Sequence, residues 1–109
     1  METKYECILA IVNTGFSDAV MEAATKCGAK GGTVLNARGT AKKEAVDFFH
    51  INFSPEKEIV MLIVDSKIKD NILKEIYETV GIKTPGQGIA FSLPVTNAIG
   101  LEKQFKEEK

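Results

Sequence analysis

Two glycine-rich stretches carry the clearest sign of ligand chemistry in this chain. Both adjoin predicted strands, and they read Gly31-Gly32-Thr33-Val34, continuing to Arg38-Gly39, and Gly86-Gln87-Gly88. Glycine allows positive φ and a close approach of backbone to ligand, and backbone N–H groups in such turns can hold phosphate without a Walker motif. Each stretch alone is also compatible with a simple turn, but together they predict a binding site. Its candidate residues are Gly31, Thr33, Val34, Arg38, Gly39, Lys42, Gly86, Gln87 and Gly88.

The sequence contains no pattern typical of a catalytic or metal site. The single histidine, His50, falls in a long loop, and the spacing of Cys7 and Cys27 does not suit a metal-ligand pair. No Gly-x-x-x-x-Gly-Lys-Ser/Thr sequence is present. We therefore expect a binding protein rather than an enzyme, with no metal site. The cations nearest the glycine stretches are Arg38, Lys42, Lys43 and Lys83, although each alone is typical of a solvated surface.

Length and charge narrow the functional class further. A chain of 109 residues suits one domain, and a net charge of −1 provides no field that would favour nucleic acid or an anionic membrane. No apolar run approaches the roughly 20 residues of a membrane span, and no signal-like segment opens the chain. Two cysteines at apolar-patterned positions fit reduced thiols in the cytoplasm. We expect a cytoplasmic protein without direct membrane insertion.

The first half of the chain predicts a strand, a helix and a second strand. Residues 5–12 alternate so that both faces of the strand are apolar, which indicates burial on both sides or a subunit contact. Ser17 is the expected helix N-cap, and Gly28 follows the helix as its C′ glycine. Residues 31–38 form the second strand, with Val34 and Leu35 as its core candidates.

Residues 40–57 show no sustained period, and a loop of about 18 residues is usually functional or disordered. Its aromatic and aliphatic side chains could pack on the domain or a neighbouring subunit. Alternatively, the loop could dock a partner. The candidate partner-binding residues are Lys43, Phe48, Phe49, His50 and Phe53.

The second half repeats the strand–helix–strand order. Residues 59–64 read as a central strand, and Asp65 or Ser66 is the expected cap of a helix that Gly81 closes. Residues 89–93 alternate as a strand with one buried face, which Pro94 should end. The apolar face of the helix is made by Ile68, Ile72, Ile76 and Val80.

This order predicts an α+β, ferredoxin-like βαββαβ fold. Its four-stranded antiparallel sheet should carry two helices on one face. Because some strands are apolar on both faces, we expect oligomerisation to cover the other face. Residues 1–101 should form the single domain, and residues 102–109 a charged tail.

With these elements in order, the chain resembles the PII signalling family, the nitrogen-regulatory trimeric proteins. The resemblance is most specific at Gly31-Gly32-Thr33-Val34, at Arg38-Gly39 before the loop, and at residues 86–95. It implies a homotrimer with adenine-nucleotide sites (ATP, ADP or AMP) in the clefts between subunits. It also implies control of a membrane transporter or metabolic enzyme through the T-loop, which residues 40–57 resemble in position.

Several family residues are replaced in this chain. Ile89 stands where the family's B-loop has a lysine, and Gly100 and Glu102 stand near its paired arginines. Lys43 replaces the loop-base glutamine, and the loop has no tyrosine for uridylylation. Since charge-assisted hydrogen bonds contribute about 1.5–3 kcal/mol each, these losses predict weak ATP binding and no response to 2-oxoglutarate. The alternative is a structural or metal-tolerance trimer resembling the CutA proteins, which share this fold.

Overall fold

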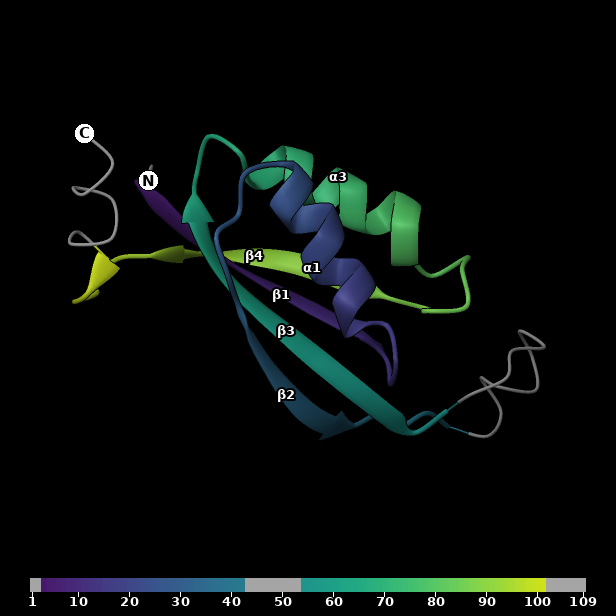
Figure 1. Cartoon of the computed structure of the whole chain (residues 1–109). Coiled ribbons are helices and arrows are strands. Elements are labelled where there is room, and N and C mark those ends of the chain that lie inside the picture. The colour runs from purple at the N-terminus through teal and green to yellow at the C-terminus, as the bar shows by residue number, and fades with distance from the viewer. Residues whose placement is uncertain (1–2, 43–53, 102–109) are drawn as a thin grey trace.

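The computed structural model describes residues 3–42 and 54–101. In chain order the elements are β1 (Tyr5–Asn13), α1 (Ser17–Lys26), β2 (Thr33–Arg38), β3 (Glu56–Asp65), α3 (Lys69–Val80) and β4 (Ile89–Val95). The strands form one sheet in the order β2-β3-β1-β4, and every pairing is antiparallel. Both helices lie on the same side of the sheet (Figure 1). The predicted α+β, ferredoxin-like fold is confirmed.

The hydrophobic core lies between the two helices and the middle strands. Alternate residues of β1 and β3 point toward the helices, and the small side chains of α1 let that helix pack closely on the sheet. Burying each large aliphatic side chain contributes about 1.5–3 kcal/mol. The largest fully buried side chains are Ile8, Val12, Val20, Val60, Leu62, Ile72, Ile76 and Val80.

The predicted N-cap residues of both helices were wrong. Phe16 occupies the N-cap of α1 and Ser17 is already helical, and α3 has Ile68 at its N-cap. Asp65 and Ser66 instead shape the turn before α3: Asp65 Oδ1 accepts from Lys67 N at 2.8 Å, and Ser66 Oγ donates to Lys4 O at 2.8 Å. The Ser66 hydroxyl thus ties the turn to Lys4, just before β1, and local sequence does not reveal this contact.

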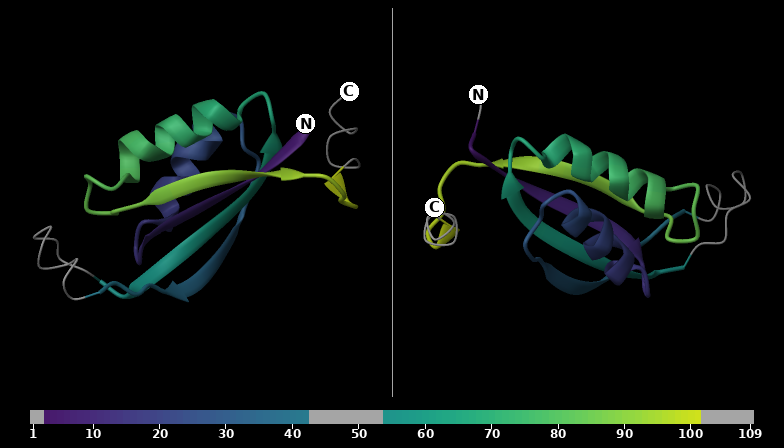
Figure 2. Two further views of the ribbon diagram at one scale, coloured as in Figure 1. Left: turned by 180° about the vertical axis from the view of Figure 1, so that it is seen from behind. Right: turned by 45° about the horizontal axis from the view of Figure 1, so that its top comes forward.

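The face of the sheet away from the helices is apolar and uncovered in one chain. On β1 it presents Cys7, Leu9 and Ile11, which pair with Leu93, Phe91 and Ile89 of β4. It also presents Ile59, Met61 and Ile63 of β3, which pair with Ile11, Leu9 and Cys7. The prediction that β1 is apolar on both faces is confirmed. Figure 2 shows this open face from behind.

Two predictions about the edge strands were wrong. Val34 and Leu35 are 46% and 43% exposed, so they do not belong to the core of one chain. The large residues of β4 also face outward, with Phe91 41% exposed, while small Ala90 packs against the core. Pro94 lies inside β4 rather than ending it, because an edge strand tolerates a residue without an N–H.

Candidate functional site

The predicted ligand residues lie at two opposite ends of the sheet. Thr33 pairs with Met61, whereas Arg38 pairs with Glu56, five positions further along both strands. At about 3.3 Å per residue this separates the two positions by roughly 17 Å. Gly31 and Thr33 therefore lie toward the end of the sheet where β1 begins and β4 ends. The turn between α3 and β4 lies at the other end, as do the ends of β2 and β1 (Figure 1).

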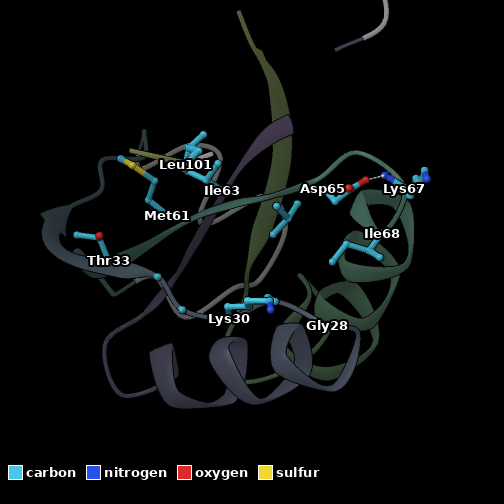
Figure 3. A pocket seen from close by; sticks show the side chains of 13 residues that line it. Gly28, Lys30, Thr33, Met61, Ile63, Asp65, Lys67, Ile68 and Leu101 are labelled. Atoms are coloured by element: carbon cyan, nitrogen blue, oxygen red, sulfur yellow. Dashed lines mark hydrogen bonds between the residues drawn. The ribbon is translucent and has the colours of Figure 1, made fainter. Parts of the chain in front are cut away.

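The first end contains a pocket with a volume of about 530 Å³. Residues 28–33, which include Lys30 and three glycines, form one part of its wall. Figure 3 shows the pocket between Met61, Ile63 and Leu101 on one side and Asp65, Lys67 and Ile68 on the other. Apolar side chains line this pocket together with Lys30, Lys67, the carboxylate of Asp65 and the hydroxyl of Thr33. This mixture suits a partly apolar ligand that carries polar or charged groups.

The glycines of the first stretch differ in their surroundings. A Cβ on Gly32 would lie 2.7 Å from Leu62 Cδ2, so packing requires glycine there. A Cβ on Gly31 would have nothing within 4 Å, and Gly31 is exposed at the pocket. Gly31 is thus the glycine of this stretch that the folded chain itself does not require.

At the second end, residues 85–88 form a turn (the 85–88 turn) held by hydrogen bonds within the chain. Gln87 N donates to Thr84 O at 2.9 Å, and Gly88 N donates to Val80 O at 2.7 Å. Both N–H groups are therefore already bonded and do not face a ligand. Gly88 is buried, and a Cβ there would lie 2.5 Å from Val80 O, which gives this glycine a packing role. Gln87 adopts a φ of 47°, in the left-handed region.

The base of the long loop adjoins this turn. Gly39 N donates to Pro55 O at 2.7 Å, which closes the loop base, and Arg38 and Lys42 are exposed there. One cation at this end was not among the predicted site residues: Lys57 is half-buried, and its Nζ donates to Asn13 Oδ1 at 2.6 Å. Lys57 continues the alternate spacing of the outward residues Ile59 and Met61, which could have placed it on β3. The sequence pattern instead assigns it to the loop of residues 40–57.

The remaining predicted site residues lie outside the described residues. These are Lys43, Phe48, Phe49, His50 and Phe53, so the predicted partner-binding role of the loop stays a prediction. Glu102, which stands near one of the family's arginines, is also outside the described residues. Ile89 is 54% exposed at the start of β4 and lines a shallow groove against α3 with Tyr77 and Ile82. Gly100 is exposed with a φ of 98°.

The described residues show little else that suggests other chemistry. Within residues 3–42 and 54–101, no three His, Cys, Asp or Glu side chains lie together as potential metal ligands. Among the helices of this part of the chain, none is long and apolar enough to cross a membrane. Burial raises the pKa of the Cys7 thiol on the open face of the sheet above its ordinary value.

Comparison with known proteins gives a consistent result. The profile of the family described as nitrogen regulatory protein P-II matches residues 5–104. The Arabidopsis thaliana PII structure bound to citrate is 25% identical, with a TM-score of 0.67 over 93% of this chain and 83% of that one. No curated protein sequence matches the chain.

Two further structures share the fold at lower identity. The B. subtilis GlnK–ATP complex has a TM-score of 0.71 at 16% identity, covering 94% of this chain and 91% of that one. A PII-like signalling protein from Thermus thermophilus has a TM-score of 0.63 at 18% identity, covering 84% of this chain and 85% of that one. Because the family profile spans nearly the whole chain, we conclude that it belongs to the nitrogen regulatory protein P-II family.

Proposed function

We propose that this protein is a cytoplasmic, homotrimeric signalling regulator and not an enzyme. It binds a small anionic effector, an adenine nucleotide, in the clefts between its subunits. The bound state then controls a membrane transporter or a metabolic enzyme through the loop of residues 40–57. The GlnK of B. subtilis was solved with ATP and the PII of Arabidopsis thaliana with citrate, and both bound molecules are small anions.

One observation carries this proposal: each end of a single chain holds only half of the predicted site. The pocket with Gly31 and Thr33 lies at one end, and Arg38, Lys42 and the 85–88 turn lie at the other. A head-to-tail ring of copies brings one end of each subunit against the opposite end of the next. The uncovered apolar face of the sheet gives such a ring a surface to bury.

The charges at the two ends favour an effector with few phosphate groups. The N–H groups of Gln87 and Gly88 are bonded within the chain, and Ile89 provides no charge. Arg38, Lys42 and Lys57 remain at this end, so we propose AMP, ADP or a cyclic nucleotide in preference to ATP. Each missing charge-assisted hydrogen bond costs about 1.5–3 kcal/mol of binding free energy.

A thermal-shift panel tests the effector class. It would compare ATP, ADP, AMP, cyclic AMP and cyclic di-AMP, each with and without Mg²⁺, 2-oxoglutarate and bicarbonate. A ligand at 100 times its Kd stabilises the folded state by about 2.7 kcal/mol, which is several degrees in Tm for a domain of this size. If no nucleotide shifts the Tm, the effector assignment is wrong.

A complementation experiment tests the shared cleft. Gly31→Val should disable the pocket half, and the double variant Arg38→Ala/Lys42→Ala should disable the other half. When the two chains are co-expressed and mix randomly in a ring, about one quarter of the clefts pair two intact halves. We expect nucleotide binding in the mixture to return to about one quarter of the wild-type capacity, while each variant alone binds much more weakly than the wild type.

The matched control is Lys74→Ala, which removes an exposed lysine from α3, away from both halves. It should bind as the wild type does. If the co-expressed variants show no recovery although each assembles normally, the site does not lie between subunits.

A further inference from the structure

Asn13, the last residue of β1, joins the 85–88 turn to the base of the long loop. Its backbone N donates to Gly86 O at 2.9 Å, and its side-chain Nδ2 donates to Pro85 O at 2.9 Å and approaches Gln87 Oε1 at 3.5 Å. On the other side, its Oδ1 accepts from Lys57 Nζ at 2.6 Å. One amide therefore holds two segments that are far apart in sequence.

The chemistry of the partners allows only one orientation of this amide. The ammonium of Lys57 can only donate, so it requires the oxygen of Asn13, and the carbonyl of Pro85 can only accept, so it requires the NH₂ group. A rotation of the amide by half a turn would break both bonds together. The Asn13 amide therefore cannot lose its bond to Pro85 by flipping while it keeps its bond to Lys57.

Neighbouring bonds extend this connection to the loop base. Thr14 N donates to Glu56 O at 3.3 Å, and Gly15 N donates to Glu58 Oε1 at 3.0 Å. Lys57 lies between these two glutamates on β3, two residues after Pro55, whose carbonyl accepts from Gly39 N. Movement of Asn13 is therefore connected to the place where the long loop leaves the sheet.

We propose that Asn13 is a positioning residue that couples the 85–88 turn to the base of the long loop. A ligand that changes the turn changes the hydrogen bonds of Asn13, and through Lys57 it changes the start of β3 and the Gly39–Pro55 closure. The signalling role rests on the proposed function, but the coupling itself is a property of the unliganded chain and can be measured without an effector.

Two substitutions separate the two sides of this connection. Asn13→Asp keeps an oxygen for Lys57 but loses the donor to Pro85 and places a carboxylate beside the oxygens of Pro85 and Gln87. Lys57→Met removes the ammonium and leaves the bonds to the turn. Asn36→Ala is the matched control, because Asn36 is an exposed asparagine on β2 away from the turn.

Amide hydrogen exchange without ligand measures the local stability of both the 85–88 turn and the base of the long loop. The N–H groups of Gln87 and Gly88 report on the turn, and the N–H of Gly39 reports on the loop base. We expect Asn13→Asp to accelerate exchange at Gly39 as well as at the turn, and Lys57→Met to accelerate it at Gly88 as well as at Gly39. Because coupling between two sites is reciprocal, each substitution should accelerate exchange at the remote site as well as at its own. We expect the remote exchange rate to rise about five- to thirtyfold, which corresponds to the loss of one or two hydrogen bonds.

The exchange rates at the turn and at Gly39 in the two variants decide whether Asn13 couples these segments. If each substitution accelerates exchange only on its own side, Asn13 is a local anchor and the proposal is wrong. Should Asn13→Asp fail to fold, exchange at Gly88 in Lys57→Met alone decides the question.

AMP serves as the ligand probe. Protection of Gly39 by AMP in the wild type should disappear in Asn13→Asp, and protection that persists would overturn the coupling. If AMP does not bind the wild type, that result counts against the effector class, and the ligand-free exchange still decides the role of Asn13.

Discussion

Two alanine substitutions at glycines should separate packing from ligand binding. A Cβ on Gly88 would lie 2.5 Å from Val80 O and 2.9 Å from Val12 Cγ1, whereas a Cβ on Gly31 would have nothing within 4 Å. We expect Gly88→Ala to destabilise the folded protein and Gly31→Ala to leave it unchanged. Bulkier Gly31→Val should still fold but should weaken nucleotide binding at the pocket.

The size of the Gly88 effect follows from what the new methyl group displaces. The substitution pushes apart Gly88 N and Val80 O, now 2.7 Å apart, and leaves buried polar groups unpaired at about 1–3 kcal/mol. Crowding against Val12, which is fully buried, adds about 1–3 kcal/mol. Gly88→Ala should therefore lower the free energy of unfolding by about 2–6 kcal/mol. Gly31→Ala should change it by less than about 0.5 kcal/mol or raise it by about 0.4–1 kcal/mol, because alanine restricts the unfolded chain.

Urea denaturation followed by circular dichroism measures both values. All proteins should be compared at the same subunit concentration, because assembly contributes to apparent stability. If Gly88→Ala is as stable as the wild type, the packing role of this glycine is wrong, and its place in the 85–88 turn would need a ligand-based explanation. If Gly31→Ala is destabilised by more than about 1 kcal/mol, the inference that a side chain at position 31 meets no neighbouring atoms is wrong.

Three further predictions address the sheet and its core. Phe91→Glu places a charge on the uncovered apolar face, so light scattering should give a smaller molar mass than for the wild type; an unchanged mass would show that assembly does not use this face. Ile72→Ala should cost about 2–5 kcal/mol in urea denaturation, because Ile72 is fully buried, and a cost below about 1 kcal/mol would contradict that packing. Burial raises the pKa of Cys7, so the folded state holds this proton more tightly than the unfolded state. The resulting stabilisation is complete below the unfolded pKa and is lost as pH rises through the folded pKa, so wild-type stability should fall more steeply above pH ~9 than that of Cys7→Ser. Equal slopes would contradict this linkage.

The element order could be predicted from sequence because it depends on local periodicity. The i, i+4 spacing of Ile72, Ile76 and Val80 and the alternation in β1 are properties of neighbouring residues, and the structure confirms both. Gly28 and Gly81 also follow the helices as expected. The predicted N-caps were wrong, and for α3 one reason is that Ser66 bonds to Lys4, a residue far away in sequence that precedes β1.

The candidate site was predicted in composition but not in arrangement. Sequence singled out the two glycine stretches, yet it could not show that they lie at opposite ends of one chain. It also could not show that the N–H groups of Gln87 and Gly88 are bonded to Thr84 and Val80. Asn13 and Lys57 were not predicted because each is an ordinary polar residue until the β1–β3 pairing places them opposite each other.

The fold class, the family and an excess of apolar strand faces over what two helices can cover could all be predicted from the order of the residues. These conclusions follow from patterns that neighbouring residues carry. The three-dimensional fold was needed to show which face of β4 lies outward, which glycines serve packing and which cation bonds to Asn13 beside the 85–88 turn. The physical reason is that each of these depends on contacts between residues far apart in the chain, such as the 2.6 Å bond between Lys57 and Asn13.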